Sequence, residues 1–182
     1  MDPKKQKSIS KLMSLALRHQ PDVLQLEIDS AGWTSVNSLL VGIKGQGHAV
    51  DMNDLLSVVR ENDKQRFQLD ESGKRIRASQ GHSIKVDLGY EASTPPERLF
   101  HGTAVRFISS IRSAGLMRQK RHHVHLHEDR ELAKSVGGRH GKPVILEVAA
   151  DKMACAGHDF FVTPNNVWLT LHVPCNFISF ED

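Results

Sequence analysis

The chain has 182 residues, 39% of them apolar, so it can bury a core in one large domain or in two small ones. Its 24 lysines and arginines exceed its 21 acidic residues, and the net charge of +3 favours an anionic partner without forming a polybasic tail. Cys155 and Cys175 make neither a CxxC pair nor a disulfide framework, which indicates a reducing setting. The opening MDPKKQKSISK lacks the apolar core of a signal peptide, so we expect a cytoplasmic protein with no membrane partner.

The first helix is predicted from apolar spacing near the start of the chain. Apolar residues recur at helical intervals over residues 9–17, Ser8 offers an N-terminal cap, and Pro21 ends the helix. Arg18 and His19 therefore fall in its last turn, where basic side chains are favoured.

Two more helices and a hairpin follow. VNSLLVGI and DMNDLLSVVREN have helical periodicity, DSAGWTS predicts a turn with a short extended piece, and RFQL and RIRA flank the turn DESGK as hairpin strands that begin near Arg66. Three helices followed by a hairpin is the order of a winged-helix domain. GYEASTPPER has two prolines and few large apolar residues, so it predicts a linker near residues 89–97.

After the linker, strands alternate with short helices. LFHGTAV and HHVHLH predict strands, RFISSIRSAGL and EDRELAKSVGG predict helices that end at glycine, and KPVILEV, FFVT, VWLTLHV and FISFE predict strands around a short DKMACAG helix. The HGT turn places small residues and backbone donors where a ligand can approach, although an ordinary strand-to-helix turn has the same composition.

The segment RHHVHLH raises the question of a metal. A strand here would place His123, His125 and His127 on one face, and three imidazoles can bind zinc. The same alternation also fits a half-buried strand with a polar face. The metallo-β-lactamase motif H-x-H-x-D-H requires Asp where this chain has His127 and His where it has Glu128. We therefore predict no metal.

Basic side chains at the ends of predicted elements point to an anionic ligand. Arg18 and His19 close a helix, and Arg66 and Arg121 each begin a strand. Arginine binds phosphate oxygens in a bidentate manner and stays charged at any relevant pH. These groups together can hold a phosphate, although exposed arginines are also ordinary solvated surface.

Several blocks carry a resemblance across nearly the whole chain. They are LALRHQP, GW followed by V-x-x-LL, NDKQRF, IRASQGHSIKV, LFHGT, RHHVHL, VGGRHGKPVIL and NNVWLT. In this order they resemble the RNA 2'-phosphotransferase (KptA) family.

The resemblance implies an α+β fold with two lobes. Residues 1–92 would form a winged-helix lobe that binds RNA phosphate, and residues 93–182 an ADP-ribosyltransferase-type lobe with a mixed β-sheet that binds NAD, with the active site in the cleft between them. It also implies a reaction in which an internal RNA 2'-phosphate is transferred to NAD. The products are RNA with a free 2'-OH, nicotinamide and ADP-ribose 1'',2''-cyclic phosphate. NAD is consumed and no metal takes part.

The resemblance also implies roles for individual residues. The catalytic set is Arg18, His19, Arg66 and Arg121, with His19 as the candidate acid or base. The NAD-binding set is His101, Gly102, Thr103, His125, Leu126, Gly138, Arg139 and Gly141. RNA binding is expected at Lys64, Arg77, Gln80 and His82. The family usually has serine after VHL, where this chain has His127.

Two other functions remain open at the level of sequence. One is an ADP-ribosyltransferase that acts on protein or on terminal nucleic-acid phosphates, which would have no reason to place Arg18, His19 and Arg66 opposite an NAD lobe. The other is a non-catalytic winged-helix nucleic-acid binder, for which DLLSVVREND is a poor recognition helix because it is acidic and apolar. The expected partner is a 2'-phosphorylated, tRNA-like RNA, bound by a monomer; both tRNA splicing and another event stay open as the source of its 2'-phosphate.

Overall fold

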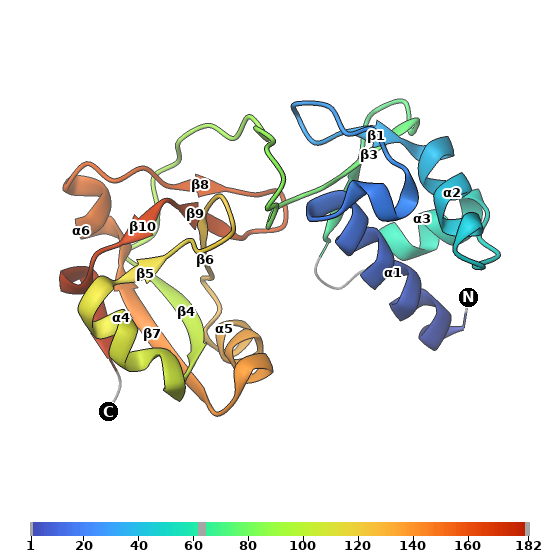
Figure 1. Cartoon of the computed structure of the whole chain (residues 1–182). Helices are drawn as coiled ribbons and strands as arrows, with labels where there is room; N and C mark the ends of the chain where they lie inside the picture. The colour runs from blue at the N-terminus through green and yellow to red at the C-terminus, as the bar shows by residue number, and fades with distance from the viewer. Residues whose placement is uncertain (1, 62–64, 181–182) are drawn as a thin grey trace. The chain divides into compact units, whose positions relative to one another are not determined.

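The computed structural model describes residues 2–61 and 65–180, and it divides into an N-terminal unit, residues 1–89, and a C-terminal unit, residues 90–182 (Figure 1). The predicted boundary, after residue 92, lies close to this division. Both units combine helices with small sheets, so the predicted α+β class is confirmed. The strand pairs of the described residues are all antiparallel, so the mixed β-sheet that was predicted for the C-terminal lobe is wrong. Within the described ranges, none of the helices has the length and apolar character needed to cross a membrane.

The N-terminal unit packs helices against a small sheet. Its elements are α1 (Pro3–Arg18), η1 (Pro21–Leu24), β1 (Thr34–Ser35), α2 (Val36–Gly45), α3 (Met52–Arg60), β2 (Phe67–Leu69) and β3 (Arg75–Ala78). The strands pair antiparallel in the order β1-β3-β2. The apolar faces of the helices and of strands β2 and β3 meet in one core, whose fully buried members include Ile9, Met13, Leu17, Leu39, Leu55 and Ile76.

Helix α1 begins earlier than predicted. Asp2 is its N-cap and accepts a hydrogen bond from the Lys5 amide at 3.0 Å, while Pro3 occupies the first helical position, where its missing N–H is not needed. The predicted cap at Ser8 is therefore wrong. The end of the helix is as predicted, because Arg18 is its last residue and His19 its C-cap.

The C-terminal unit is built from short strands and helices. Its elements are β4 (Arg98–Ala104), η2 (Val105–Phe107), α4 (Ile108–Ala114), β5 (Leu116–Met117), β6 (Val124–Leu126), α5 (Arg130–Gly137), η3 (Gly138–His140), β7 (Pro143–Ala149), α6 (Ala150–Cys155), β8 (Phe161–Val162), β9 (Trp168–Thr170), β10 (His172–Val173), η4 (Cys175–Phe177) and β11 (Ile178–Phe180). They form antiparallel sheets of order β11-β7-β4, β6-β9-β8 and β10-β5.

A bridge between Phe100 and His127 joins two of these sheets. The Phe100 amide donates to the His127 carbonyl at 2.7 Å, and the His127 amide donates back at 2.9 Å. Strand β6 therefore lies beside β4, which brings the RHHVHLH and LFHGT segments together. The segment that was predicted to be a linker packs on this same unit, where the Ser93 amide donates to the Phe160 carbonyl at 2.7 Å.

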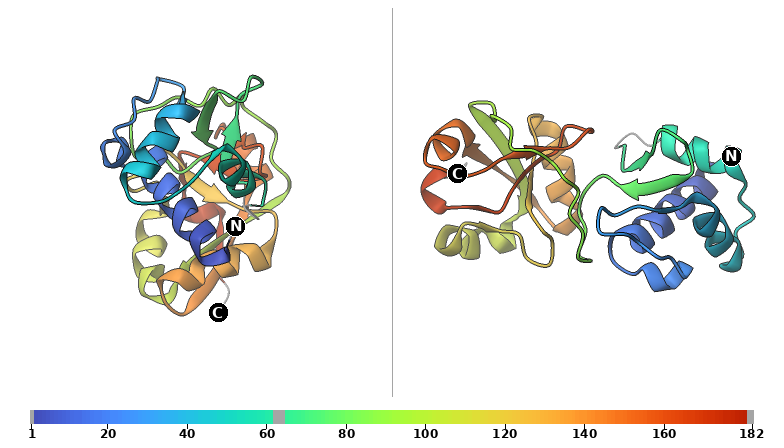
Figure 2. Two further views of the ribbon diagram at one scale, coloured as in Figure 1. Left: turned by 90° about the vertical axis from the view of Figure 1, so that its right-hand side faces the viewer. Right: turned by 90° about the horizontal axis from the view of Figure 1, so that it is seen from above.

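Helix α5 lies against strand β4 (Figure 1 and Figure 2), and two glycines allow this close packing. A Cβ on Gly102 would overlap the backbone carbonyl of Ala133 in α5. A Cβ on Gly137 would come within 2.6 Å of the Thr103 carbonyl oxygen. The glycine of HGT is therefore needed for helix–strand packing, a requirement that the sequence interpretation of an open ligand approach did not include.

Candidate functional site

In the N-terminal unit, the loop of residues 79–84 follows β3 and caps helix α1. The Ser83 and Ile84 amides donate to the Arg18 carbonyl at 2.9 and 3.3 Å. The Ser83 hydroxyl lies 2.9 Å from His19 Nδ1. The last carbonyls of a helix have no partner within the helix, so this loop satisfies one of them and fixes the position of Arg18 and His19 at the same time.

The same loop holds Arg66 in place. The Ser79 amide donates to the Arg66 carbonyl at 2.9 Å, and the Ser79 hydroxyl donates to the Gln65 carbonyl at 3.0 Å. Gly81 has a positive φ of 85°, and a Cβ there would lie 3.7 Å from Nη1 of Arg18. Glycine thus permits the turn, whereas a Cβ at this distance would make only an ordinary van der Waals contact with the Arg18 guanidinium.

The structure brings Arg18 and Arg66 to one pocket of about 470 Å³. Its other walls come mainly from the solvent-facing side of α1. They are Pro3, Gln6, Lys7, Ser10, Lys11, Ser14, Val58 and Glu61. Of the lining side chains within residues 2–61 and 65–180, four are cationic and one is acidic, so the pocket is suited to an anion.

The predicted RNA-binding residues have mixed surroundings. Arg77 is half-buried, donates to the carbonyls of Ala31 and Leu88 at 3.2 and 3.3 Å, and stacks 4.6 Å from the Trp33 ring centre. His82 is buried and Gln80 half-buried, both within the capping loop. Lys64 lies outside the described residues. An RNA contact of these four residues stays a prediction, and the contacts of Arg77 with Ala31, Leu88 and Trp33 join parts of the N-terminal unit.

In the C-terminal unit, His101 and His125 lie on the neighbouring strands β4 and β6. His101 Nδ1 is 3.0 Å from the His125 carbonyl oxygen, so Nδ1 carries the proton because a carbonyl can only accept. Arg121 Nη1 is 3.3 Å from His125 Nδ1, which must then be the acceptor because guanidinium nitrogens only donate. The turn that presents Arg121 closes with its amide donating to the Arg118 carbonyl at 3.0 Å.

The charges that act on these groups are positive. Burial lowers the pKa of His101, the hydrogen bond to His125 opposes this shift, and the charge of Arg121 lowers the pKa further. Desolvation and the charge of Arg139 lower the pKa of Arg121, which nevertheless stays charged at neutral pH. Two guanidiniums close enough to repel each other beside a neutral imidazole favour an anionic ligand.

The other predicted NAD-binding residues supply backbone and packing. Leu126 is fully buried, Thr103 is 6% exposed, and Gly141 has a φ of 133° that only glycine adopts readily. Gly138 begins η3 and leaves open space where a Cβ would stand. A direct role of these residues in NAD binding stays a prediction.

Comparison with known proteins shows which family the chain resembles. The profile described as RNA 2'-phosphotransferase, Tpt1 / KptA family, matches residues 4–172. A probable RNA 2'-phosphotransferase of Hahella chejuensis is 50% identical over 179 residues, covering 98% of this chain and 96% of that protein. Proteins of the same name from Burkholderia lata and Acaryochloris marina are 50% and 46% identical, covering 96% and 94% of this chain and 90% and 94% of their own lengths.

The chain belongs to the RNA 2'-phosphotransferase family. The resemblance predicted from the sequence blocks is confirmed, and so, at the level of class, is the prediction of a transferase that acts on RNA. The match spans both units, so each of the two clusters lies within the family region.

His123 and His125, in and next to strand β6, have partners that do not suit a metal. The His123 ring packs edge-on against Phe161 at 5.6 Å between centres, and His125 has the Arg121 cation beside it. Over residues 2–61 and 65–180, no group of three or more His, Cys, Asp or Glu side chains has the arrangement of a metal site.

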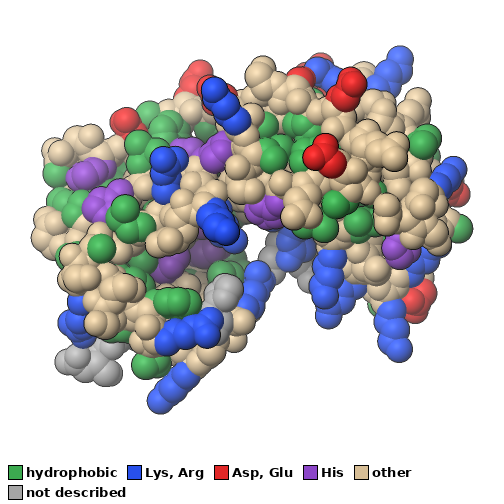
Figure 3. Space-filling model, in the orientation of Figure 1, with side chains coloured by type: hydrophobic (Ala, Val, Ile, Leu, Met, Phe, Trp, Pro, Cys, Tyr) green, Lys and Arg blue, Asp and Glu red, His purple; other side chains and the backbone are tan. Residues whose placement is uncertain are grey.

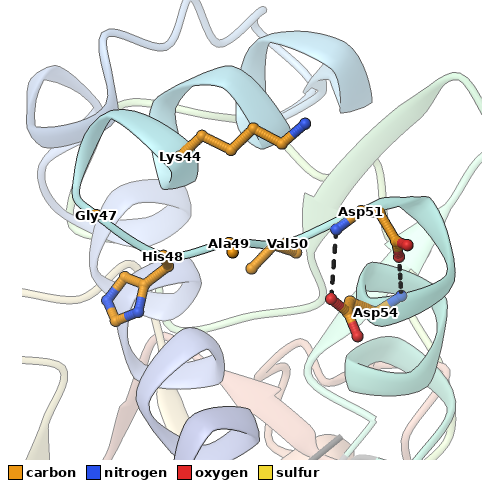
Figure 4. A pocket seen from close by; sticks show the side chains of 7 residues that line it. All are labelled: Lys44, Gly47, His48, Ala49, Val50, Asp51 and Asp54. Atoms are coloured by element: carbon orange, nitrogen blue, oxygen red, sulfur yellow. Dashed lines mark hydrogen bonds between the residues drawn. The ribbon is translucent and has the colours of Figure 1, made fainter.

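A second pocket in the N-terminal unit has different chemistry (Figure 4). It has a volume of about 570 Å³ and is lined by Lys44, Gly47, His48, Ala49, Val50, Asp51 and Asp54. Its two carboxylates form the capping box of α3, with the Asp54 amide donating to Asp51 at 2.8 Å and the Asp51 amide donating to Asp54 at 3.4 Å. None of the residues predicted for the site lines this pocket.

Sequence reasoning missed the residues that position the arginines. Ser79, Gly81 and Ser83 lie in the block IRASQGHSIKV, which was quoted for the resemblance but assigned only Arg77, Gln80 and His82. The available signal was a glycine between serines just after a strand, which is typical of a tight loop that donates hydrogen bonds.

Proposed function

We propose that this protein removes an internal RNA 2'-phosphate by transferring it to NAD, giving 2'-OH RNA, nicotinamide and ADP-ribose 1'',2''-cyclic phosphate. The observation that carries the proposal is the pocket shared by Arg18 and Arg66, whose backbones are both held by the capping loop. A family that acts on RNA 2'-phosphates needs such an anion site. The substrate is a 2'-phosphorylated, tRNA-like RNA, as expected after tRNA splicing, and the protein acts as a monomer.

In the N-terminal unit, Arg18 and Arg66 bind the RNA 2'-phosphate. Their guanidiniums supply paired N–H donors that match phosphate oxygens and keep their charge whether the phosphate is attacking or being attacked. His19 lies at the end of α1 beside Arg18, with Nδ1 at 2.9 Å from Ser83 Oγ. That contact orients the ring, so Nε2 can reach a proton on the bound substrate.

In the C-terminal unit, His101 and the arginines bind NAD. His101 keeps its Nδ1 proton on the His125 carbonyl and stays neutral because burial lowers its pKa, so its Nε2 lone pair can accept from a ribose hydroxyl. Arg121 and Arg139 bind the anionic groups of the two substrates. Arg121 acts on the transferred phosphate, and Gly138, Arg139 and Gly141 line the nucleotide side.

The bound phosphate takes part in two successive chemical steps, first as nucleophile and then as the group that is attacked. First a 2'-phosphate oxygen forms a bond to the nicotinamide ribose carbon, and the C–N bond breaks as nicotinamide leaves with the electron pair. Then the neighbouring ribose hydroxyl attacks phosphorus and the RNA 2'-oxygen leaves. The first step needs positioning and charge neutralisation, whereas the second must remove a proton from the attacking hydroxyl and deliver one to the leaving oxygen. His19 serves the second step.

The fold of each unit suits the lobe that is proposed for it. In the N-terminal unit, the order of α1, α2, α3 and the β2–β3 hairpin supports a winged-helix lobe over residues 1–92. In the C-terminal unit, the sheets around β4 and β6 with α5 support an ADP-ribosyltransferase-type lobe over residues 93–182.

The test is incubation of the protein with an oligonucleotide that carries one labelled internal 2'-phosphate, with and without NAD. We expect the label to appear in ADP-ribose 1'',2''-cyclic phosphate only when NAD is present, and EDTA to leave the rate unchanged. If the label remained on RNA as an ADP-ribosyl adduct, the protein would be an ADP-ribosyltransferase that stops after the first step. Release of the label without NAD, or loss of activity on chelation that zinc restores, would contradict the proposal.

A further inference from the structure

The pocket that holds Arg18 and Arg66 continues along helix α1 in a way that the 2'-phosphate alone does not require. Lys7, Ser10, Lys11 and Ser14 line it at intervals of three and four residues, which places them on one face of the helix. The opposite face, with Ile9, Met13, Ala16 and Leu17, is fully buried in the core. This polar face of α1 is therefore solvent-accessible and ends at Arg18.

The dimensions of this face fit an extended chain. From Lys7 to Arg18 the helix rises about 16 Å, and one step of four residues rises about 6 Å. That step is comparable to the separation of neighbouring phosphates along an RNA strand. A single phosphate group at Arg18 and Arg66 would fill only one end of a pocket of about 470 Å³.

The polar face of α1 carries positive charge, as binding to a polyanion requires. Lys7 and Lys11 are exposed, and Ser10 and Ser14 are half-buried with hydroxyls that can donate to phosphate or ribose oxygens. Among the described residues that line the pocket, the acidic one is Glu61, which accepts a hydrogen bond from Gln6 Nε2 at 2.9 Å. Figure 3 shows Lys and Arg side chains projecting from the side of the N-terminal unit where α1 lies.

We propose that the polar face of α1 binds the RNA backbone that flanks the 2'-phosphate. Lys7 and Lys11 contact successive phosphodiesters, Ser10 and Ser14 bind the sugar–phosphate chain, and Arg18 with Arg66 takes the 2'-phosphate at the end of the track. This inference rests on the proposed function for the identity of the ligand. It makes the substrate an RNA segment several nucleotides long, recognised through its backbone without a sequence preference.

The test compares Lys7→Ala/Lys11→Ala with the matched control Lys4→Ala/Lys74→Ala. Lys4 lies on α1 and Lys74 in the hairpin turn, both are exposed, and neither lines the pocket. The salt dependence of binding to an ordinary single-stranded RNA is measured first. We expect the Lys7/Lys11 variant to flatten the slope of log K against log salt by about 0.7 for each lost phosphate contact, and the control to leave it unchanged.

The second readout is substrate length. The factor by which Lys7→Ala/Lys11→Ala raises KM should be larger for a long 2'-phosphorylated oligonucleotide than for a 2'-phosphorylated dinucleotide, which has few flanking phosphodiesters. Circular dichroism verifies that both variants keep their helices. An unchanged salt slope, a length-independent effect, or equal losses in the control would overturn the proposal, as would an acidic peptide that competes as well as RNA of the same charge.

Failure of the proposed function and failure of the inference about the α1 face give different experimental results. Binding and its salt slope are measured on RNA without a 2'-phosphate, so they do not depend on turnover. A wild-type protein that fails to release 2'-phosphate would contradict the proposed function, whereas an unaltered slope in Lys7→Ala/Lys11→Ala would contradict only the role of the α1 face.

Discussion

The two units position the side chains of their candidate sites by different means. In the N-terminal unit, Arg18 and His19 lie at the end of α1 and Arg66 directly precedes β2, and one irregular loop holds all three through backbone and serine hydrogen bonds. In the C-terminal unit, His101 and His125 lie on adjacent strands, and their positions follow from strand pairing. The first arrangement depends on a few loop residues, while the second depends on the packing of the whole unit.

This difference suggests what each unit is built to bind. The N-terminal pocket is lined by flexible Lys and Arg side chains along a helix, which suits a chain-like polyanion. The C-terminal cluster keeps a neutral imidazole beside two guanidiniums, which suits a ligand that carries hydroxyls as well as phosphates. We therefore expect substitution of Arg66 to affect mainly the binding of RNA and substitution of His101 to affect mainly the binding of NAD, whereas Arg121, which is assigned to the transferred phosphate, is an exception in the C-terminal unit.

The largest effects are expected at the arginines. Arg18→Ala, Arg66→Ala and Arg121→Ala should each lower turnover by about 10²-fold or more, because each removes a charged contact to the transferred phosphate. Circular dichroism and thermal unfolding should show that the fold persists. The matched controls are Arg60→Ala and Arg118→Ala, both exposed, and neither lies in the proposed site. Near-normal turnover in any of the first three would remove that arginine from the phosphate site.

His19→Ala should separate the two chemical steps. Because only the second step moves protons, we expect it to slow by about 10²-fold or more while the first is affected less, so that 2'-phospho-ADP-ribosylated RNA accumulates. Gel analysis of a labelled 2'-phosphate during a time course would show this species. Equal slowing of both steps without an intermediate would make His19 a phosphate-binding residue instead.

Gly102→Ala should act through the fold. Its methyl group would overlap the Ala133 carbonyl and force α5 away from β4, which we expect to lower the free energy of unfolding by about 1–3 kcal/mol or more. Gly138→Ala is the matched control for stability, because a Cβ there meets open space. Denaturant unfolding of the two variants measures the difference. Equal stability would show that α5 and β4 are not packed as described.

Much of the fold could be predicted from periodicity, and the failures have physical causes. Helix α1 was predicted to start late because its first turns, rich in Lys and Ser, carry no apolar pattern. Their signal was instead Pro3 after the capping Asp2. Strand β5 was not predicted because it has two residues, Leu116 and Met117, and exists through pairing with β10 far along the chain.

The candidate site shows the same limit. Arg18, His19, Arg66 and Arg121 could be singled out from element ends, because basic residues there often meet ligands. The packing role of Gly102 could not be predicted, because the Ala133 carbonyl that leaves no room for a side chain there belongs to a later helix. Likewise, no spacing pattern reveals that Ser79 and Ser83 hold the arginines, because those contacts exist only after the loop folds back on α1.

The smallest effect is expected from pH. Burial lowers the pKa of His101 below its ordinary value of 6.5, so the folded protein keeps it neutral at pH values where the unfolded chain takes up a proton. Its contribution to stability is therefore full above 6.5 and is lost as the pH falls from there through the lowered pKa. NAD affinity should hold until that lower pKa is reached. Measuring NAD affinity as a function of pH for the wild type and for His101→Asn isolates the effect of this imidazole. A loss of wild-type NAD affinity that begins above pH 6.5 would contradict the lowered pKa of His101.

The central claim, that the Arg66 pocket binds the RNA 2'-phosphate and the His101 cluster binds NAD, is tested most directly by calorimetric titration of one substrate at a time. NAD, 2'-phosphorylated RNA and the same RNA with a free 2'-OH are titrated separately into the wild type, Arg66→Ala and His101→Asn. We predict that Arg66→Ala binds NAD like the wild type and loses the preference for 2'-phosphorylated RNA, whereas His101→Asn loses NAD affinity and keeps that preference. Loss of both affinities from either single substitution, in a variant that remains folded, would contradict the account.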